Sequence, residues 1–331
     1  MSSKKTRLQI VSRRPEKAVK EMGSGGRGQS RPAPARGLAH IPGPPRVSGR
    51  WLLSAVALSI AGAALCAWGV LCLLFWQGSW QLLYHPAAAV AHTPASAGMA
   101  FEPVEFAATD TGVPRLKGWW IPAAAGAPLK RFTVVTLHGQ NGNMGDTVDA
   151  LAGLHASGVN ILAFDYRGYG QSQFARPSEA HWREDADWAI EYLTGTRHID
   201  PDSIVLDGTG LGANLALEVA ATHPELAGVV LHAPIAAPMN AVFGDARARM
   251  VPAHLLVRDR YDLNEAAAAL RVPVLWFEWT AQAGQGGAQA EPAAYRKITS
   301  NKMLVWLSES GDPDKQTQDA LSRWFDGLQV R

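Results

Sequence analysis

The chain has 331 residues, of which 47% are hydrophobic and 18% are charged, and its formal net charge is +2. This composition excludes a disordered or collagen-like polymer and is typical of one globular domain with accessory segments. Residues 1–50 carry 12 Lys and Arg against two Glu, whereas residues 51–331 carry 19 against 27 Asp and Glu. Because the basic part is rich in Gly, Pro and Ser, we expect a disordered tail and no nucleic-acid-binding domain.

An uncharged apolar run of 26 residues, Trp51 to Trp76, follows the tail. About 20 helical residues suffice to cross the hydrocarbon layer, so the run predicts a transmembrane helix. It is longer than the apolar region of a cleavable signal peptide, for which Ala89-Val90-Ala91 is a weak alternative cleavage site. A buried core helix is the other alternative, although such helices rarely stay uncharged for this length.

The basic tail before this helix predicts that the N-terminus is cytoplasmic. We therefore expect a single-pass protein of a bacterial-type inner membrane, with its globular domain in the periplasm. The expected segments are a tail over 1–50, a transmembrane helix over 51–76, a linker over 77–100 and a domain over 101–331.

Short apolar runs alternate with helical stretches after residue 100. This alternation predicts an α/β domain with a mostly parallel sheet of about eight strands and helices on both faces. The expected strands are Phe101–Ala108, Arg115–Ile121, Phe132–His138, Val159–Asp165, Ser203–Asp207, Gly228–His232, Val272–Phe277 and Lys302–Leu307. The expected helices are Thr147–Ala156, Ala180–Thr194, Leu211–Thr222 and Asp314–Leu328. Residues 236–270 interrupt the alternation, and we expect them to form an inserted cap.

Three motifs follow the third, fourth and fifth expected strands. They are His138-Gly139-Gln140-Asn141-Gly142-Asn143, Asp165-Tyr166-Arg167-Gly168-Tyr169-Gly170 and Gly208-Thr209-Gly210-Leu211-Gly212. In this order the motifs resemble those of the α/β-hydrolase superfamily, and within it the membrane-anchored branch similar to serine aminopeptidase-like and prolyl-oligopeptidase-like hydrolases. The resemblance covers roughly residues 82–331 and implies an α/β-hydrolase fold with a small cap. It also implies that His138 shapes its loop and that Arg167 braces loops.

The resemblance implies a Ser, acid and His triad in that chain order, and here all three positions are substituted. The elbow pattern G-x-S-x-G reads G-T-G-L-G, which places Gly210 where the nucleophile should be. Gln282 stands at the acid position and Asp312 at the histidine position, and no histidine follows His254. Removal of a triad costs on the order of 10⁶ in kcat in a comparable enzyme. We therefore expect a catalytically inactive protein with no imidazole at the elbow.

The backbone around the elbow is a candidate binding pocket. If the fold is kept, the N–H groups of Gln140 and Leu211, together with Gly139, should face one cavity where the helix dipole favours negative charge. This arrangement predicts a site for a carboxylate, phosphate or carbonyl oxygen, and hence for a small carboxylate or acyl ligand or a protein partner. The alternative is that these glycines only make tight turns.

Cofactor and metal sites are less well supported. Gly208-x-Gly210-x-x-Ala213 matches a dinucleotide fingerprint, but the next strand ends in His232 rather than in the acid that binds the ribose. The histidines lack ligand spacing, and both cysteines, Cys66 and Cys72, lie in the apolar run. We expect neither a cofactor nor a metal.

A second function stays open, namely a hydrolase of an ester or amide substrate that uses a non-standard nucleophile. Ser172, Ser308 and Ser310 are the candidates for that role. Trp279 lies beside the former acid position, where it could fill the emptied site.

Overall fold

The computed structural model describes residues 43, 47–280, 290–308 and 311–329. Its centre is an eight-stranded sheet in the order β10-β9-β8-β7-β4-β6-β3-β2. The strands are β2 (Glu102–Ala108), β3 (Pro114–Ile121), β4 (Thr133–Leu137), β6 (Asn160–Asp165), β7 (Ile204–Thr209), β8 (Gly228–His232), β9 (Val274–Trp279) and β10 (Lys302–Leu307). Neighbouring strands from β10 to β6 pair in parallel. At the other edge β3 pairs antiparallel with β6, and β2 pairs antiparallel with β3. The predicted mostly parallel sheet is confirmed.

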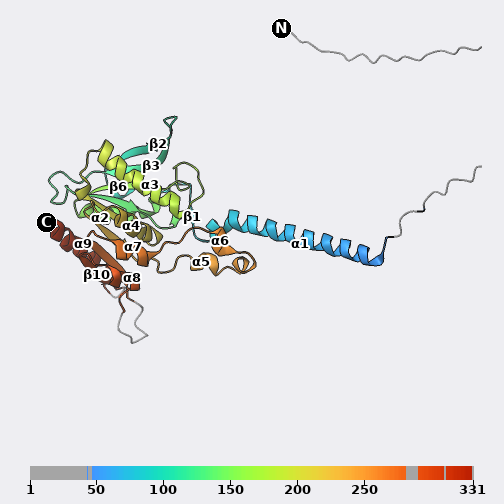
Figure 1. Cartoon of the computed structure of the whole chain (residues 1–331). Helices are drawn as coiled ribbons and strands as arrows, with labels where there is room; N and C mark the ends of the chain where they lie inside the picture. Colours follow the sequence, from blue (N-terminus) through green and yellow to red (C-terminus); the bar gives the residue numbers. More distant parts are fainter. Residues whose placement is uncertain (1–42, 44–46, 281–289, 309–310, 330–331) are drawn as a thin grey trace, which may run out of the picture. The chain divides into compact units, whose positions relative to one another are not determined.

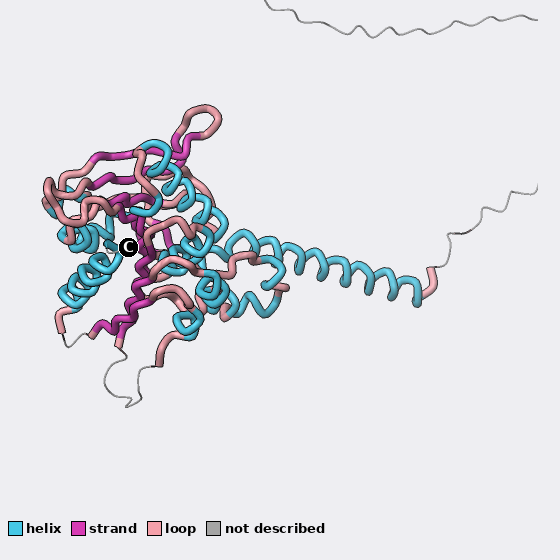
Figure 2. Tube along the Cα trace, turned by 60° about the vertical axis from the view of Figure 1, so that its left-hand side comes forward, coloured by secondary structure: helices cyan, strands magenta, loops and turns pink. Residues whose placement is uncertain are grey.

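Helices cover both faces of this sheet (Figures 1 and 2). One apolar core lies between the sheet and α3 (Glu179–Glu191), α4 (Leu211–Thr222), α7 (Leu263–Ala269) and α8 (Ala293–Lys297). A second core lies between the opposite face and α2 (Val148–Ala156) and α9 (Pro313–Gln329). Because successive strand residues point to opposite faces, neighbours such as Val205 and Leu206 are both fully buried, one in each core.

The apolar run forms α1 (Gly49–Gly78), which the 3₁₀ turn η1 (Ser79–Leu82) continues. The chain divides into two compact units, residues 1–56 and 57–331, so most of α1 belongs to the second unit. By length and composition this 34-residue stretch can cross a membrane, which is consistent with a single-pass anchor.

The stretch after α1 packs into the domain. Tyr84 is 1% exposed, and its hydroxyl hydrogen-bonds to Asp259 Oδ2 (2.7 Å) and to the hydroxyl of Tyr261 (2.9 Å). The next residues form β1 (His85–Pro86), which pairs in parallel with β5 (Asn141–Gly142). The segment expected as a linker is therefore held at its start by side-chain and backbone hydrogen bonds.

Between β8 and β9 the chain forms α5 (Asn240–Phe243), the 3₁₀ turn η6 (Ala246–Met250), α6 (Ala253–Leu256) and α7. The first three elements have five residues or fewer. The longer α7 begins at a good cap, because Asp262 Oδ1 accepts hydrogen bonds from the N–H groups of Asn264 (2.9 Å) and Glu265 (3.1 Å). This segment lies in the region for which the sequence predicts an inserted cap.

Candidate functional site

The elbow is a sharp turn between β7 and α4, and Gly210 is its only residue. Gly210 has φ +58° and ψ −120°, a conformation in which a side chain is strained. A Cβ atom at Gly210 would have space, since the nearest atom, Gln140 Oε1, would lie 3.6 Å away. Backbone conformation, and not lack of room, therefore makes glycine favourable at the position where this fold carries its nucleophile.

The two flanking glycines have a different role. A Cβ on Gly208 would overlap the backbone of Gly212 and Ala213, and a Cβ on Gly212 would overlap the carbonyl oxygens of Leu137 and His138. These glycines allow α4 to lie directly against β7 and β4, which fixes the start of α4 at the carboxyl edge of the sheet.

The three residues expected to form a pocket lie together at this edge. Gly139 and Gln140 follow β4, and Leu211 begins α4. A Cβ on Gly139 would lie 3.3 Å from the carbonyl oxygen of Thr209, the last residue of β7. The Leu211 N–H donates to Gln140 Oε1 at 3.4 Å, so the side chain of Gln140 itself occupies the donor that should hold a ligand oxygen.

The loop that carries Gln140 is fixed from two sides. The backbone carbonyl oxygen of Gln140 accepts a hydrogen bond from the N–H of His85 (2.8 Å) and another from the Tyr169 hydroxyl (2.9 Å). Burial raises the pKa of Tyr169 well above its ordinary value, so the phenol stays a donor at every physiological pH. The oxygen that meets the elbow, Gln140 Oε1, therefore belongs to a side chain whose backbone is held in place by two hydrogen bonds.

Of the two residues that the sequence places at the acid and histidine positions, the structure describes only Asp312. Asp312 is exposed, and its Oδ1 accepts the N–H of Lys315 (3.1 Å) at the start of α9, so it caps a helix. Gln282 lies outside the described residues. Trp279 ends β9 with 47% of its surface exposed.

Of the three alternative serine nucleophiles, Ser172 has its hydroxyl engaged in a loop contact. The Ser172 hydroxyl donates to the carbonyl oxygen of Asp165 (2.6 Å) and accepts the N–H of Lys117 (3.0 Å), so it holds a loop against β3. Ser308 follows β10, and its carbonyl oxygen accepts the N–H of Gly311 (3.2 Å). Ser310 lies outside the described residues.

The backbone of a further histidine, His232, contacts the elbow, whereas its ring lies against Asp207 and Phe277. His232 ends β8, its carbonyl oxygen accepts the N–H of Gly210 (2.9 Å), and its Nε2 lies 3.1 Å from Asp207 Oδ1. The ring stacks on Phe277 with 4.7 Å between centroids. Alternation along the strands places His232, Asp207 and Phe277 on the face that α2 and α9 cover. The partner of the His232 ring is thus the carboxylate of Asp207 and not a hydroxyl.

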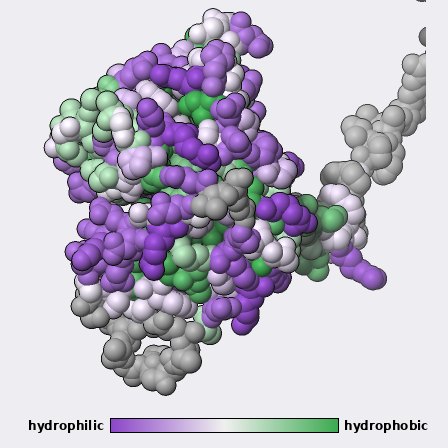
Figure 3. All heavy atoms as spheres, turned by 90° about the vertical axis from the view of Figure 1, so that its left-hand side faces the viewer, coloured by the Kyte–Doolittle hydropathy of each residue, from purple (hydrophilic) through white to green (hydrophobic). Residues whose placement is uncertain are grey.

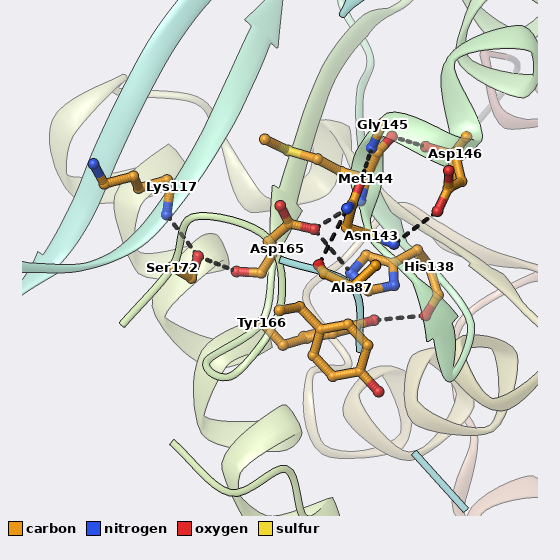
Figure 4. A network of polar contacts seen from close by, with 12 residues as sticks. Ala87, Lys117, His138, Asn143, Met144, Gly145, Asp146, Asp165, Tyr166 and Ser172 are labelled. Carbon is orange, nitrogen blue, oxygen red and sulfur yellow. Dashed lines mark hydrogen bonds and ion pairs between the residues drawn. The ribbon is translucent and has the colours of Figure 1, made fainter. Parts of the chain in front are cut away.

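His138 belongs to a buried polar network rather than to a reactive site (Figure 4). In Figure 4 the His138 ring and the Asp165 carboxylate point toward each other, and His138 Nε2 lies 3.4 Å from Asp165 Oδ1. That oxygen also accepts the N–H of Met144 (2.7 Å), and His138 Nδ1 lies 2.8 Å from the carbonyl oxygen of Gly139. Asp165 is fully buried. The network joins the ends of β4 and β6 to the loop before α2.

Arg167 braces the loop after β6 against α3. Its backbone N–H and its Nε donate to the two oxygens of the buried Asp185 carboxylate, at 2.8 and 2.5 Å. A terminal guanidinium nitrogen donates to Glu184, and the guanidinium lies 4.6 Å from the centre of the Trp188 ring. Burial raises the pKa of Asp185 to about 6, although the hydrogen bonds from Arg167 oppose this shift.

The comparisons with known proteins agree with this geometry. The family model described as "Serine aminopeptidase, S33" matches residues 129–263. The "Uncharacterized protein Rv2307c" of Mycobacterium tuberculosis is 34% identical over 219 residues, which cover 65% of this chain and 74% of that protein. The chain belongs to the α/β-hydrolase superfamily. The matched model, together with the "Uncharacterized protein YfhR" of Salmonella typhimurium (32% identical over 200 residues, 57% of this chain and 65% of that protein), supports the serine aminopeptidase branch.

Solved structures show the same fold. The Pyrococcus furiosus esterase Pf2001 superposes with a TM-score of 0.52 at 18% identity and covers 73% of this chain and 99% of its own. The structure of DcsB in complex with its substrate analogue gives a TM-score of 0.55 at 15% identity, covering 70% of this chain and 100% of its own. The α/β-hydrolase fold expected from the three motifs is confirmed.

No cluster of three or more His, Cys, Asp and Glu side chains that could hold a metal ion occurs in the described part of the chain. The dinucleotide reading of Gly208 and Gly210 also has a structural answer. The strand after the fingerprint ends in His232, which pairs with Asp207 instead of offering a carboxylate to a ribose.

The carboxyl group of Glu218, a residue of α4, should make the free energy of unfolding pH-dependent. Burial, and secondarily the neighbouring Glu179 of α3, raises the pKa of Glu218 from 4.5 to about 8, while Arg183 of α3 opposes the shift. Asp262, the cap of α7, adds a further negative charge. Above pH 4.5 the unfolded chain ionises this group and the native chain does not, so stability should fall as pH rises to about 8.

We expect Glu218→Gln to remove this loss, which should be on the order of 2–4 kcal/mol between pH 5 and pH 8. The measurement is the free energy of unfolding in urea at both pH values. The exposed Glu191 of α3 gives the matched control, since Glu191→Gln should leave the difference between the two pH values as in the parent. If the free energy of unfolding changed equally between the two pH values in the parent and in Glu218→Gln, the raised pKa of Glu218 would be contradicted.

Proposed function

We propose that this protein is a membrane-anchored α/β-hydrolase-fold protein without hydrolase activity, which binds a ligand or a protein partner at the elbow. The observation that carries the proposal is Gly210, a residue without a side chain at the point where the fold presents its nucleophile. Without a hydroxyl there, the histidine of a triad has no proton to accept and no nucleophile forms.

The polar contacts of six described histidines support inactivity, because none of these rings is bonded to a hydroxyl in those contacts. In the described part of the chain the rings of His85, His138, His155, His181, His223 and His232 meet carboxylates, backbone carbonyls or the side-chain oxygen of Asn141. Serine-type catalysis needs an imidazole bonded to the attacking hydroxyl. Loss of a triad leaves only about 10³–10⁴ over water, too little for a biological turnover.

The bond between Leu211 N–H and Gln140 Oε1 supports the binding role. A ligand that presents a carbonyl or carboxylate oxygen would replace this amide oxygen on the same donor, at the N-terminus of a 12-residue helix. The proposed ligand class is therefore a small carboxylate or acyl compound, with the C-terminal carboxylate or a carbonyl of a protein partner as the other possible source. Gly139, Gln140 and Leu211 form the proposed pocket.

The proposed organisation of the chain rests on its sequence segments. A basic tail over 1–50, a spanning helix over 51–76 and a domain over 101–331 with a cap at 236–270 give a single-pass protein. The excess of Lys and Arg before the helix supports a cytoplasmic N-terminus and a periplasmic domain. Alkaline phosphatase fused after Arg331 should be active, whereas a fusion before residue 51 should be inactive.

Gly210→Ser tests inactivity directly. The serine should cost about 1–3 kcal/mol of stability, because its Cβ must take a left-handed conformation, and it should restore no esterase activity. The measurements are the rate of nitrophenyl ester hydrolysis and labelling by a fluorophosphonate probe, in the parent and in the variant. A heat-sensitive adduct on any serine of the parent would favour a hydrolase with a non-standard nucleophile, and turnover by the variant would reveal a base at the elbow.

A thermal-shift screen of fatty acids, acyl esters and short peptides tests the binding role. A ligand that raises the Tm of the parent should change its apparent affinity in Gln140→Ala, which frees the Leu211 N–H. It should lose its affinity in Leu211→Pro, which removes that N–H. Gln173→Ala, at an exposed glutamine in another loop, is the control. A Tm shift that is equal in all variants would place the ligand elsewhere.

A further inference from the structure

An apolar groove lies between α1 and the segment around α6, far from the elbow in sequence. It has a volume of about 350 Å³. Cys72, Leu73 and Trp76 line it from α1, and Leu255, Leu256 and Arg258 line it from the other side. The lining is thus apolar except for one cation, Arg258.

The segment before the groove is attached to α1 at a defined level. The indole Nε1 of Trp68 donates to the carbonyl oxygen of Met250 at 3.0 Å. Farther along the same helix, Phe75 is 5% exposed and belongs to the core of the domain. Residues 246–256 therefore run beside the last turns of α1. Figure 1 shows α6 next to the end of α1 that joins the domain.

This level lies within the reach of a bilayer. About 20 residues of a helix cross the hydrocarbon layer, so a span that starts at Trp51 extends to about residue 70 and includes Trp68. Met250 meets Trp68 at that depth, and its side chain is 54% exposed. Leu255, which lines the groove, is 82% exposed. Two large apolar side chains thus point outward where the surroundings of a spanning helix are lipid.

Cations lie one to two turns beyond this level, where a helix leaves the hydrocarbon for the headgroups. The guanidinium of Arg176 lies 5.5 Å from the centre of the Trp76 ring, and Arg258 lines the groove together with Trp76. Tryptophan and arginine together are typical of the headgroup layer. By contrast, the face of the domain shown in Figure 3 is mostly hydrophilic, with hydrophobic side chains only in separate patches.

We propose that the edge formed by Met250 and Leu255 inserts into the adjacent leaflet of the membrane, and that the groove holds one acyl chain of a phospholipid. The guanidinium of Arg258 then meets the headgroup phosphate, and Leu73 and Leu256 contact the chain. Burial of these apolar side chains supplies the driving force, because lipid replaces water on them. This inference rests on the proposed anchoring of α1 in the membrane, and it names phospholipid as a ligand of the cap.

Depth measurements on the full-length chain test the insertion. The protein, with Cys66→Ala and Cys72→Ala, is placed in vesicles of phosphatidylethanolamine and phosphatidylglycerol and carries one nitroxide on Leu255→Cys, Leu65→Cys or Val113→Cys. Leu65 is an exposed residue of α1, and Val113 is an exposed apolar residue on the turn between β2 and β3. The collision ratio of oxygen to a water-soluble nickel chelate should be several-fold higher at 255 and 65 than at 113.

The three positions separate the two ways of failing. A high ratio at 65 with a low ratio at 255 would overturn the insertion while leaving the anchor intact. Low ratios at all three positions would overturn the anchor itself.

Occupancy of the groove is tested with a phospholipid that carries a photoactivatable diazirine on its acyl chain, in the same vesicles. Mass spectrometry should find adducts on residues 255–256 and on Leu58, an exposed residue of α1 outside the groove. Leu255→Asp should abolish the adducts at 255–256 and preserve those at Leu58, whereas Leu255→Ile should preserve both. Adducts on Leu58 alone in the parent would show that no lipid enters the groove.

Discussion

Gly212→Ala should prevent the domain from folding stably, with a loss of about 4 kcal/mol or more. The methyl group would overlap the carbonyl oxygens of Leu137 and His138, which belong to the backbone of β4 and its following loop. A backbone in the middle of a sheet cannot turn aside as a side chain can, so α4 would have to move away from β4. The measurement is the free energy of unfolding in urea, or the yield of folded protein if no transition is seen.

Gly210→Ala, two residues earlier in the same turn, is the matched control. Here the methyl group has room and only the left-handed backbone is unfavourable, so the cost should be about 1–3 kcal/mol. The two alanines should therefore differ by a wide margin. A milder effect at 212 than at 210 would mean that α4 does not lie against β4 as described.

Asp185→Ala should be the second most damaging change, with a loss of about 3–5 kcal/mol. Asp185 is fully buried and accepts hydrogen bonds from both the backbone and the guanidinium of Arg167. Its removal leaves a cation that is 10% exposed at the side chain, with Glu184 as its one remaining ion-pair partner and the carbonyl oxygen of His181 as a neutral one. Unfolding should be measured at pH 8, where the Asp185 carboxyl, with its pKa of about 6, is ionised.

The cost should come from the stranded charge rather than from the lost pair. The double variant Arg167→Met/Asp185→Leu replaces both partners by apolar side chains and should be clearly more stable than Asp185→Ala alone. Glu184→Ala, which removes the half-exposed partner, should cost less than 1 kcal/mol, about the value of a surface pair. If Glu184→Ala proved as damaging as Asp185→Ala, the outer pair would be the one that holds Arg167.

The sequence predicted the sheet well because its strands are short apolar runs buried on both faces. Gly228–His232 was predicted with the observed bounds, and Val159–Asp165 began one residue early. The strand predicted over Ser203–Asp207 is shorter than β7, which continues to Thr209. Helix α3 was extended to Thr194, where the structure has α-helix only to Glu191 and then a π turn.

The candidate site was predictable only where it depends on local backbone. The elbow at Gly210 follows from glycine spacing, which is a property of five neighbouring residues. The pair of His232 and Asp207 depends on the register of β7 against β8, and the bond of Gln140 to Leu211 depends on a side-chain rotamer 71 residues away. The groove beside α6 joins residues about 180 positions apart. Packing, and no motif, brings such residues together.

The junction after α1 gives the domain a restricted freedom of movement. Tyr84 is bonded to Asp259 and Tyr261, and the next two residues pair with β5, so only a few residues separate the helix from two fixed attachments. Hydrogen bonds thus tie this junction to the domain on two sides, so we expect the last turns of α1 and the domain to move as one piece rather than to turn independently about a flexible linker.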